Sequence, residues 1–440
     1  MSFSNGTPLT AESIAGMFPF QQEGSSASGS VSSSNLVAVE AIDDLTVKYT
    51  LSAPTATFPS FLAGAGMGTV FDPVAAADEA GWADNPIGTG PFVLESRDIN
   101  NETIVAKNPN YWRTDADGMQ LPYLDSVSFR PIPDEGTRLN ALLSESDPVN
   151  AMITLRAATI RDARAESGIT LYEASGNEVG SLTYNTQRPP FDDLRVRQGL
   201  NKMVDQNNVN EALGGIGTPG TQWVSPEDPY YSQDAADAYL TFDFEGGKAL
   251  LQDYVDDPAR SDGRSPGDKL DVPLQCPPDP TLIAAMQVVE QVWTASELVD
   301  VSLTQFDQAT HIDLALNDEH AAHCWRQGGQ GDPFGTVGPY IAPPEASSLN
   351  ISNYFDQQLA DWAAEGGATD DLATRQDRYS KIMTELNDKA VWSYFAHTAT
   401  LIATTPDVKG LVSWTLPSGS LGIGVQEAIT RWADVWISQG

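Results

Sequence analysis

The sequence predicts an α/β fold with parallel strands. Apolar residues alternate with other residues over Leu270–Leu274 and over Val299–Leu303, which is typical of strands. Between them, Asp279-Pro280 is a helix start, and apolar positions recur at helical spacing over residues 282–293. Strand, helix and strand within about 35 residues predict a βαβ unit. A chain of 440 residues with 41% hydrophobic residues is long enough for two or three domains with cores of their own.

One residue conflicts with this unit. Pro273 lies inside the first strand, where its missing N–H removes a donor from the ladder. The sequence therefore predicts an edge position or a bulge at that point.

The N-terminal part predicts short strands and one helix. Residues Gly24–Ser34 are rich in glycine and serine and are expected to form a surface loop. Alternation over Val37–Leu51, around an Asp-Asp turn, predicts a β-hairpin or meander. Further strands are expected at Thr103–Lys107 and Ser126–Pro131, and an amphipathic helix at Thr137–Ser144.

The C-terminal part predicts helices followed by a strand. Asp192 or Asp193 can cap a helix whose apolar stripe runs over Val196–Val204. Two helices are expected within Asn353–Ala390, split at a pair of glycines, and a strand over Val391–Ala403.

The charge balance excludes some partners. The chain has 60 Asp and Glu against 24 Lys and Arg, a net charge of −36. Such a surface repels the phosphates of nucleic acids and anionic lipids. We interpret the charge as an adaptation for solubility in a salty medium. No apolar run approaches the roughly 18–20 residues that span a bilayer.

The two cysteines are expected to form a disulfide. Cys276 ends the first strand of the βαβ unit, and Cys324 ends a later strand that should join the same sheet. Ends of neighbouring strands lie within the Cα–Cα range of about 4.4–6.8 Å that a disulfide requires.

Three histidines are candidate metal ligands by residue type. His311, His320 and His323 lie close in sequence to Glu319 and Cys324, but a metal needs ligands that converge. A strand over residues 321–326 would place His320 and His323 on opposite faces, so we expect no metal site. The sequence has no Gly-x-Ser-x-Gly, His-Glu-x-x-His or P-loop motif, and we expect no catalytic residues and no cofactor.

Several motifs follow one another in a particular order. They are Phe3–Glu12 (FSNGTPLTAE), Pro86–Phe92 (PIGTGPF), Asn108–Trp112 (NPNYW), Pro122–Asp125 (PYLD), Phe129–Asp134 (FRPIPD), Tyr184–Asp193 (YNTQRPPFDD) and Arg195–Gln198 (RVRQ). In this order they resemble the family 5 extracytoplasmic solute-binding proteins, which are the dipeptide, oligopeptide and nickel receptors of ABC importers.

The resemblance implies a two-lobe periplasmic-binding-protein-like fold (type II, cluster C), with an interlobe ligand cleft and two crossover hinge strands. Residues 1–86 would be the remnant of a subdomain inserted in lobe I, 87–184 lobe I, 185–396 lobe II, and 397–440 the return to lobe I. In the family the block at Phe3–Glu12 lies well inside the protein, so we expect this chain to lack its front end and signal sequence. A naturally short relative is the alternative.

The resemblance also implies a function. The protein would be a monomeric receptor that captures a peptide or peptide-like solute outside the cytoplasmic membrane and delivers it to the permease subunits of an ABC importer by lobe closure. The alternatives are an extracellular peptide-processing enzyme and a non-functional fragment of the receptor.

The resemblance suggests particular site residues. Trp325 matches a family Trp that lines the cleft, and Asp332 matches a later Asp-Pro. In peptide receptors of the family, a carboxylate three residues after the Trp holds the solute's amino group; here that position is Gly328. Arg326 is the nearest cation for a solute carboxylate. The expected cleft walls are Asn185, Thr186, Tyr394 and His397.

Overall fold

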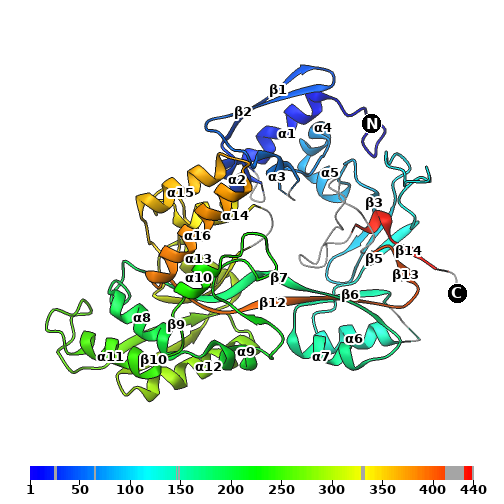
Figure 1. Cartoon of the computed structure of the whole chain (residues 1–440). Helices are drawn as coiled ribbons and strands as arrows, with labels where there is room; N and C mark the ends of the chain where they lie inside the picture. Colours follow the sequence, from blue (N-terminus) through cyan, green and yellow to red (C-terminus); the bar gives the residue numbers. More distant parts are fainter. Residues whose placement is uncertain are drawn as a thin grey trace. The chain divides into compact units, whose positions relative to one another are not determined.

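The computed structural model describes residues 1–23, 27–63, 66–144, 146, 149–328, 332–411 and 431–438 (Figure 1). The chain forms two compact units. Unit 1 comprises Met1–Ala174 and Thr400–Gly440, and unit 2 comprises Ser175–Ala399. The chain passes between them within strands β7 (Thr170–Tyr184) and β12 (Trp392–Thr404). The four-segment division expected from the sequence stays a prediction.

The N-terminal part of unit 1 contains the predicted hairpin. Strands β1 (Leu36–Asp43) and β2 (Thr46–Leu51) pair antiparallel beside helix α1 (Ala11–Glu23). The expectation of a loop over Gly24–Ser34 is wrong for Ser28–Ser33, which form helix α2, and residues 24–26 lie outside the described residues. The side chain of Val31 is buried among apolar residues of α1 and β1, which stabilises this helix despite its serines.

The rest of unit 1 is built from small sheets and helices. Strands β3 (Phe92–Asp98), β4 (Glu102–Lys107) and β5 (Ser126–Phe129) form an antiparallel sheet, which confirms the two strands predicted there. Strand β6 (Ala151–Thr154) pairs with the end of β12. The other elements are α3 (Phe58–Ala63), α4 (Pro73–Ala76), α5 (Glu79–Asp84), α6 (Glu135–Leu143), α7 (Ala157–Ala165), β13 (Val408–Lys409), a 3-10 helix (Trp432–Asp434) and β14 (Trp436–Ile437).

Unit 2 contains the predicted βαβ unit. Strands β9 (Leu270–Cys276) and β10 (Val299–Gln305) pair in parallel, and helix α12 (Pro280–Ala295) connects them with Asp279 as its N-cap. Strand β11 (Ala322–Gly328) is parallel to β9 and antiparallel to β7. The strand order is β10-β9-β11-β7-β12, and β8 (Thr218–Pro219) pairs with β12.

Pro273 is tolerated because one neighbouring strand pairs with only part of β9. The strand lies between β10 and β11, yet β11 pairs only with Leu274 and Gln275. Pro273 precedes this paired part, so it occupies a local edge of an interior strand.

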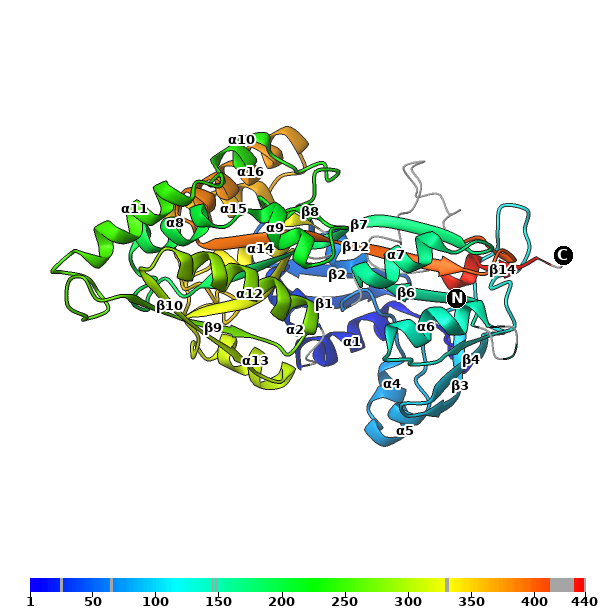
Figure 2. The same ribbon diagram turned by 90° about the horizontal axis from the view of Figure 1, so that it is seen from below.

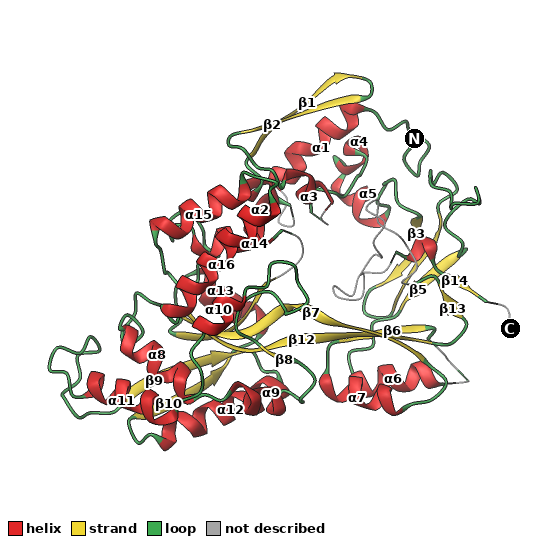
Figure 3. Cartoon of the chain, in the orientation of Figure 1, coloured by secondary structure: helices red, strands yellow, loops and turns green. Residues whose placement is uncertain are grey.

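Helices lie on either side of the unit 2 strands (Figure 3). One side, which we call the apolar face, is covered by α8 (Leu194–Met203), α9 (Gln206–Ala212), α11 (Phe244–Val255) and α12. Helices α9 and α12 lie side by side in both views (Figures 1 and 2). The other side, the mixed face, is covered by α10 (Gln233–Ala238), α13 (Gln308–Leu316), α14 (Pro333–Ile341), α15 (Gln357–Gly367) and α16 (Leu372–Asp388).

The alternation along the strands decides which side chains reach each face. On β12, Trp392 and Tyr394 belong to the mixed face and Phe395 to the apolar face, as alternation along a strand requires. In the described part of the chain, no helix has both the length and the apolar character needed to cross a membrane.

Candidate solute-binding site

Trp325 lies on β11 and projects from the mixed face. Its neighbours on the same face of the strand are His323 and Gln327, and Cys324 points to the opposite, apolar face. The indole is partly exposed, and its N–H donates to the hydroxyl of Tyr340 on α14 at 3.5 Å. Trp325 is thus a large, partly accessible aromatic side chain on a rigid strand.

A buried hydrogen-bond network lies next to Trp325 along the same face of β11. The Gln327 side-chain amide donates to the Thr183 hydroxyl at 2.9 Å, and its oxygen accepts from the Ser181 hydroxyl. The two hydroxyls come from β7, where Ser181 is the register partner of Trp325. All three polar side chains are fully buried, so the network fixes β11 against β7.

Three histidine rings gather on the other side of Trp325. His311 stacks on His323 with ring centroids 3.7 Å apart, and His320 meets His323 edge-on at 5.1 Å. The expectation that His320 and His323 lie on opposite faces of a strand is wrong, because β11 begins only at Ala322. His320 lies in the preceding turn, which brings its ring back toward the strand.

The histidines are buried and uncharged at neutral pH. His311 Nε2 interacts with the Cys324 carbonyl oxygen at 2.8 Å, and His320 Nε2 with the Ile351 carbonyl oxygen at 2.7 Å. Burial lowers the pKa of both groups. The pKa of His323 is lowered to about 2 by burial and by the neighbouring His311 and His320.

The stacked arrangement does not suit a metal ion. Parallel rings direct their nitrogen lone pairs along parallel planes, whereas a metal needs lone pairs that converge. Among the described residues, no group of three or more His, Cys, Asp and Glu is arranged to hold a metal ion.

Asn185 and Thr186 join the end of β7 to two turns. The Asn185 side chain donates to the His320 carbonyl oxygen and accepts from Asn353, each at 3.3 Å. The Thr186 backbone N–H and hydroxyl both donate to the Ser352 carbonyl oxygen. Their predicted contact with a solute stays a prediction; the contacts present hold the turn that carries His320.

Asp332 stabilises the start of α14. Its carboxylate accepts from the Phe334 N–H at 3.0 Å as the N-cap and pairs with Arg375 of α16. The Arg375 guanidinium also donates to the Tyr230 hydroxyl at 2.7 Å and lies 4.9 Å from the ring centre of Phe334. Asp332 therefore has a structural function in this arrangement, and a solute contact stays a prediction.

Arg326 lies on the opposite side of β11 from Trp325. Strand β11 continues to Gly328, so an early end of the strand, which would have let both side chains meet one solute, is not observed. The Arg326 guanidinium is exposed and pairs with Glu178 of β7 at 3.1 Å. A solute carboxylate would have to compete with Glu178 for it.

Tyr394 and His397 of β12 are almost completely buried, each 1% exposed. Burial raises the pKa of Tyr394 well above its usual value and lowers the pKa of His397 to about 4. Both are uncharged at neutral pH, and their predicted contact with a solute stays a prediction.

The predicted disulfide between Cys276 and Cys324 is confirmed, with the Cα atoms 4.9 Å apart. The register explains it, because His323 pairs with Gln275 and the cysteines follow at the next position. The disulfide ties β11 to β9 directly beside Trp325.

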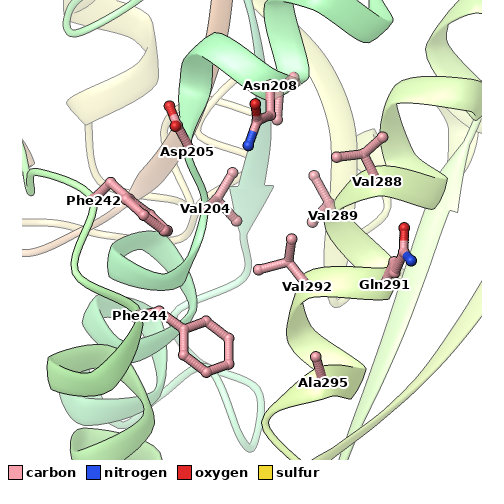
Figure 4. Close-up of a pocket in the computed structure, with 11 residues that line it drawn as sticks. Val204, Asp205, Asn208, Phe242, Phe244, Val288, Val289, Gln291, Val292 and Ala295 are labelled. Carbon is pink, nitrogen blue, oxygen red and sulfur yellow. The ribbon is translucent and has the colours of Figure 1, made fainter.

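A pocket of about 200 Å³ opens on the apolar face, between α9, α12 and the start of α11 (Figure 4). Phe242, Phe244, Val204 and Val292 form its walls. Asp205 is the charged residue among those that line it, and its carboxylate caps α9. None of the sequence-predicted site residues lines this pocket.

Comparison with known proteins gives relatives of one kind. The E. coli dipeptide-binding protein is 28% identical over 388 residues, which cover 85% of this chain and 68% of the relative. Heme-binding protein A of Haemophilus influenzae is 25% identical over 392 residues, which cover 86% of this chain and 67% of the relative. The chain thus spans about two thirds of the length of these relatives.

Solved structures show the same fold at lower identity. The binding protein AgaA from A. tumefaciens R10, in complex with agropinic acid, matches with a TM-score of 0.78 at 23% identity, over 100% of this chain and 85% of the other. The ABC transporter-associated periplasmic binding protein DppA from Helicobacter pylori, in complex with the peptide STSA, matches with a TM-score of 0.77 at 18% identity. This match covers 100% of this chain and 84% of the other.

These structural matches establish a periplasmic-binding-protein fold. The family model of the bacterial extracellular solute-binding proteins, family 5, matches residues 1–346. The chain belongs to this family of extracellular solute-binding proteins.

Proposed function

We propose that this protein captures a peptide or peptide-like solute outside the cytoplasmic membrane and delivers it to the permease subunits of an ABC importer. Family membership carries the solute-binding part of this proposal. The names of relatives and neighbours favour a peptide, since they include a dipeptide-binding protein and complexes with Met-Leu and STSA. The solute binds and dissociates without covalent change.

Trp325 is the residue to which we assign the main solute contact. It is a partly exposed indole, held by a hydrogen bond to Tyr340 on a strand fixed by the disulfide. An indole offers a flat apolar surface for side chains of varied shape. Gly328 provides no carboxylate for an amino group, so we propose recognition through the peptide backbone, side chains and carboxyl end.

The test begins with the solute that the protein carries. Protein purified from its own source is denatured, and the released small molecules are identified by mass spectrometry. We expect peptides or peptide-like compounds in near-equal molar amount to the protein. A non-peptide solute would contradict the substrate class.

A second measurement separates receptor from enzyme. Met-Leu and Ser-Thr-Ser-Ala are incubated with the purified protein, and the mixture is analysed after denaturation. The proposal requires that the peptides be recovered unchanged; cleaved or modified peptide would favour the peptide-processing enzyme.

A further inference from the structure

The aromatic surroundings of Trp325 suggest a function for the buried histidines. The Trp325 indole centre lies 5.8 Å from the ring centre of His323 and 6.3 Å from that of His311. The interplanar angles are 39° and 30°, so the indole leans over the stacked imidazoles. These rings come from two elements, since His311 belongs to α13 and His323 to β11.

The stack is unusual for a protein interior. His311 and His323 are 1% and 0% exposed, and neither ring nitrogen of His323 makes a hydrogen bond of ordinary geometry. Buried polar atoms without partners cost free energy, so an aliphatic side chain would fill this space more favourably. Planar rings, however, provide a flat surface that aliphatic side chains do not.

We propose that the His311–His323 stack is a platform that holds the indole of Trp325 in place, which makes His323 a positioning residue for solute binding. The solute-binding part rests on the proposed function of Trp325; the platform itself does not.

The electrostatics agree with this function. Burial lowers the pKa of both histidines, so the rings are neutral in neutral solution and can lie in contact without repulsion. Asp318 favours the charged form of the nearby His320, and Arg188 opposes it. The polar contacts of the stack lie at its rim, where His311 Nε2 meets the Cys324 carbonyl oxygen, so the ring faces stay free for stacking.

The stack also couples Trp325 to the disulfide-linked strands. His311 interacts with the backbone of Cys324, the residue that is bonded to Cys276. Helix α13 is thereby fastened to β11 directly beside the indole. The indole N–H also donates to the Tyr340 hydroxyl, so the indole is held both by the rings beside it and by this hydrogen bond.

The test follows the Trp325 side chain directly. The protein is labelled with 5-fluorotryptophan, and Trp325→Phe identifies the fluorine signal of Trp325 among those of the 10 tryptophans. There are three test variants. His323→Ala removes the ring on β11, and His311→Ala removes the ring on α13. His323→Phe keeps a planar ring at the β11 position. His397→Phe, on a different strand, is the matched control.

We expect His323→Ala and His311→Ala to shift or broaden the Trp325 signal, whereas His323→Phe and His397→Phe leave it close to that of the unchanged protein. If His323→Ala does not fold, His311→Ala decides the matter. A Trp325 signal that keeps its position in the alanine variants would overturn the proposal. A Trp325 signal that moves as far in His323→Phe as in His323→Ala would also overturn it.

Solute affinity is measured separately by calorimetry with Met-Leu and Ser-Thr-Ser-Ala. We expect His323→Ala to weaken binding about tenfold and His323→Phe to restore most of the affinity. If Trp325→Ala leaves the affinity of both peptides unchanged, the proposed solute contact of Trp325 fails, while the fluorine signals still decide whether the platform exists.

Discussion

The two faces of the unit 2 sheet differ in what their buried residues do. The apolar face is filled by side chains such as Leu200, Val272 and Trp293, and the Trp293 indole N–H donates to the Leu200 carbonyl oxygen. The mixed face buries three histidines and the Gln327 network beside a partly exposed Trp325. One face is a conventional core, whereas the other places polar groups where apolar ones would be more stable. This difference agrees with our proposal that the mixed face holds the solute.

The largest expected effect tests the apolar face. Trp293→Ala should lower the free energy of unfolding by about 3–5 kcal/mol, because it leaves a cavity at a fully buried site. Gln291→Ala, at an exposed position of the same helix, should change it by less than about 0.5 kcal/mol. Urea denaturation of both variants checks this, and equal stabilities would show that the apolar face is not the main core.

Removing the disulfide should come next in size. Replacing Cys276 and Cys324 together by alanine opens a loop of 48 residues, which we expect to cost roughly 2–4 kcal/mol. Both sulfurs lie on the apolar face, so the main loss should appear as stability, with a smaller loss of solute affinity because the disulfide fixes the strand that carries Trp325. The check is denaturation with and without reductant; a midpoint that reductant does not move would contradict the expectation.

On the mixed face, Gln327→Ala should cost about 1–3 kcal/mol, since it leaves the buried hydroxyls of Ser181 and Thr183 without their partner. Gln327→Glu has a similar shape but brings a charge, and we expect it to be at least as destabilising. The sharper outcome concerns binding, because both variants should also weaken Met-Leu affinity. A variant that loses stability but keeps affinity would argue against a link between this network and Trp325.

The smallest expected effect is a loss of stability at acidic pH. The pKa values of His323 and His397 are lowered in the folded protein, to about 2 and about 4, against about 6.5 when unfolded. The unfolded chain therefore binds more protons below pH 6.5, and stability is lost as the pH falls below that value. Each histidine should contribute about 1 kcal/mol per pH unit, and the variant His397→Phe should have a flatter profile between pH 6.5 and pH 5. Unchanged slopes would contradict the burial of His397.

Much of the apolar face could be predicted from the sequence. Alternation over Leu270–Leu274, the Asp279 cap and the helical spacing that follows reflect short-range rules, and the structure has the βαβ unit they indicate. The disulfide was predicted correctly because Cys276 and Cys324 lie on neighbouring strands, but the expectation that Cys324 ends its strand is wrong: Cys276 ends β9, whereas Cys324 lies near the start of β11. By contrast, the helix at Ser28–Ser33 was missed because its stability comes from the packing of Val31 rather than from local propensity.

The mixed face was harder to predict, because its contacts join residues that are far apart in sequence. Gln327 is linked to Ser181 and Thr183 across 146 and 144 positions, and Asp332 to Arg375 across 43. The histidine cluster depends on a strand that begins two residues after His320. Sequence patterns do not predict the first residue of a strand with that precision. A signal was present, however, in the short spacing of His311, His320 and His323 before a strand tryptophan.

The most direct test of the account compares one aromatic residue from each face. Met-Leu and Ser-Thr-Ser-Ala are titrated by calorimetry into the unchanged protein, into Trp325→Ala, and into Phe244→Ala, which opens the pocket on the apolar face. For whichever peptide binds the unchanged protein, we predict that Trp325→Ala weakens its affinity about tenfold or more. Phe244→Ala should leave the affinity for the same peptide within about twofold of the unchanged protein. Affinity that survives Trp325→Ala but is lost in Phe244→Ala would contradict the assignment of solute binding to the mixed face.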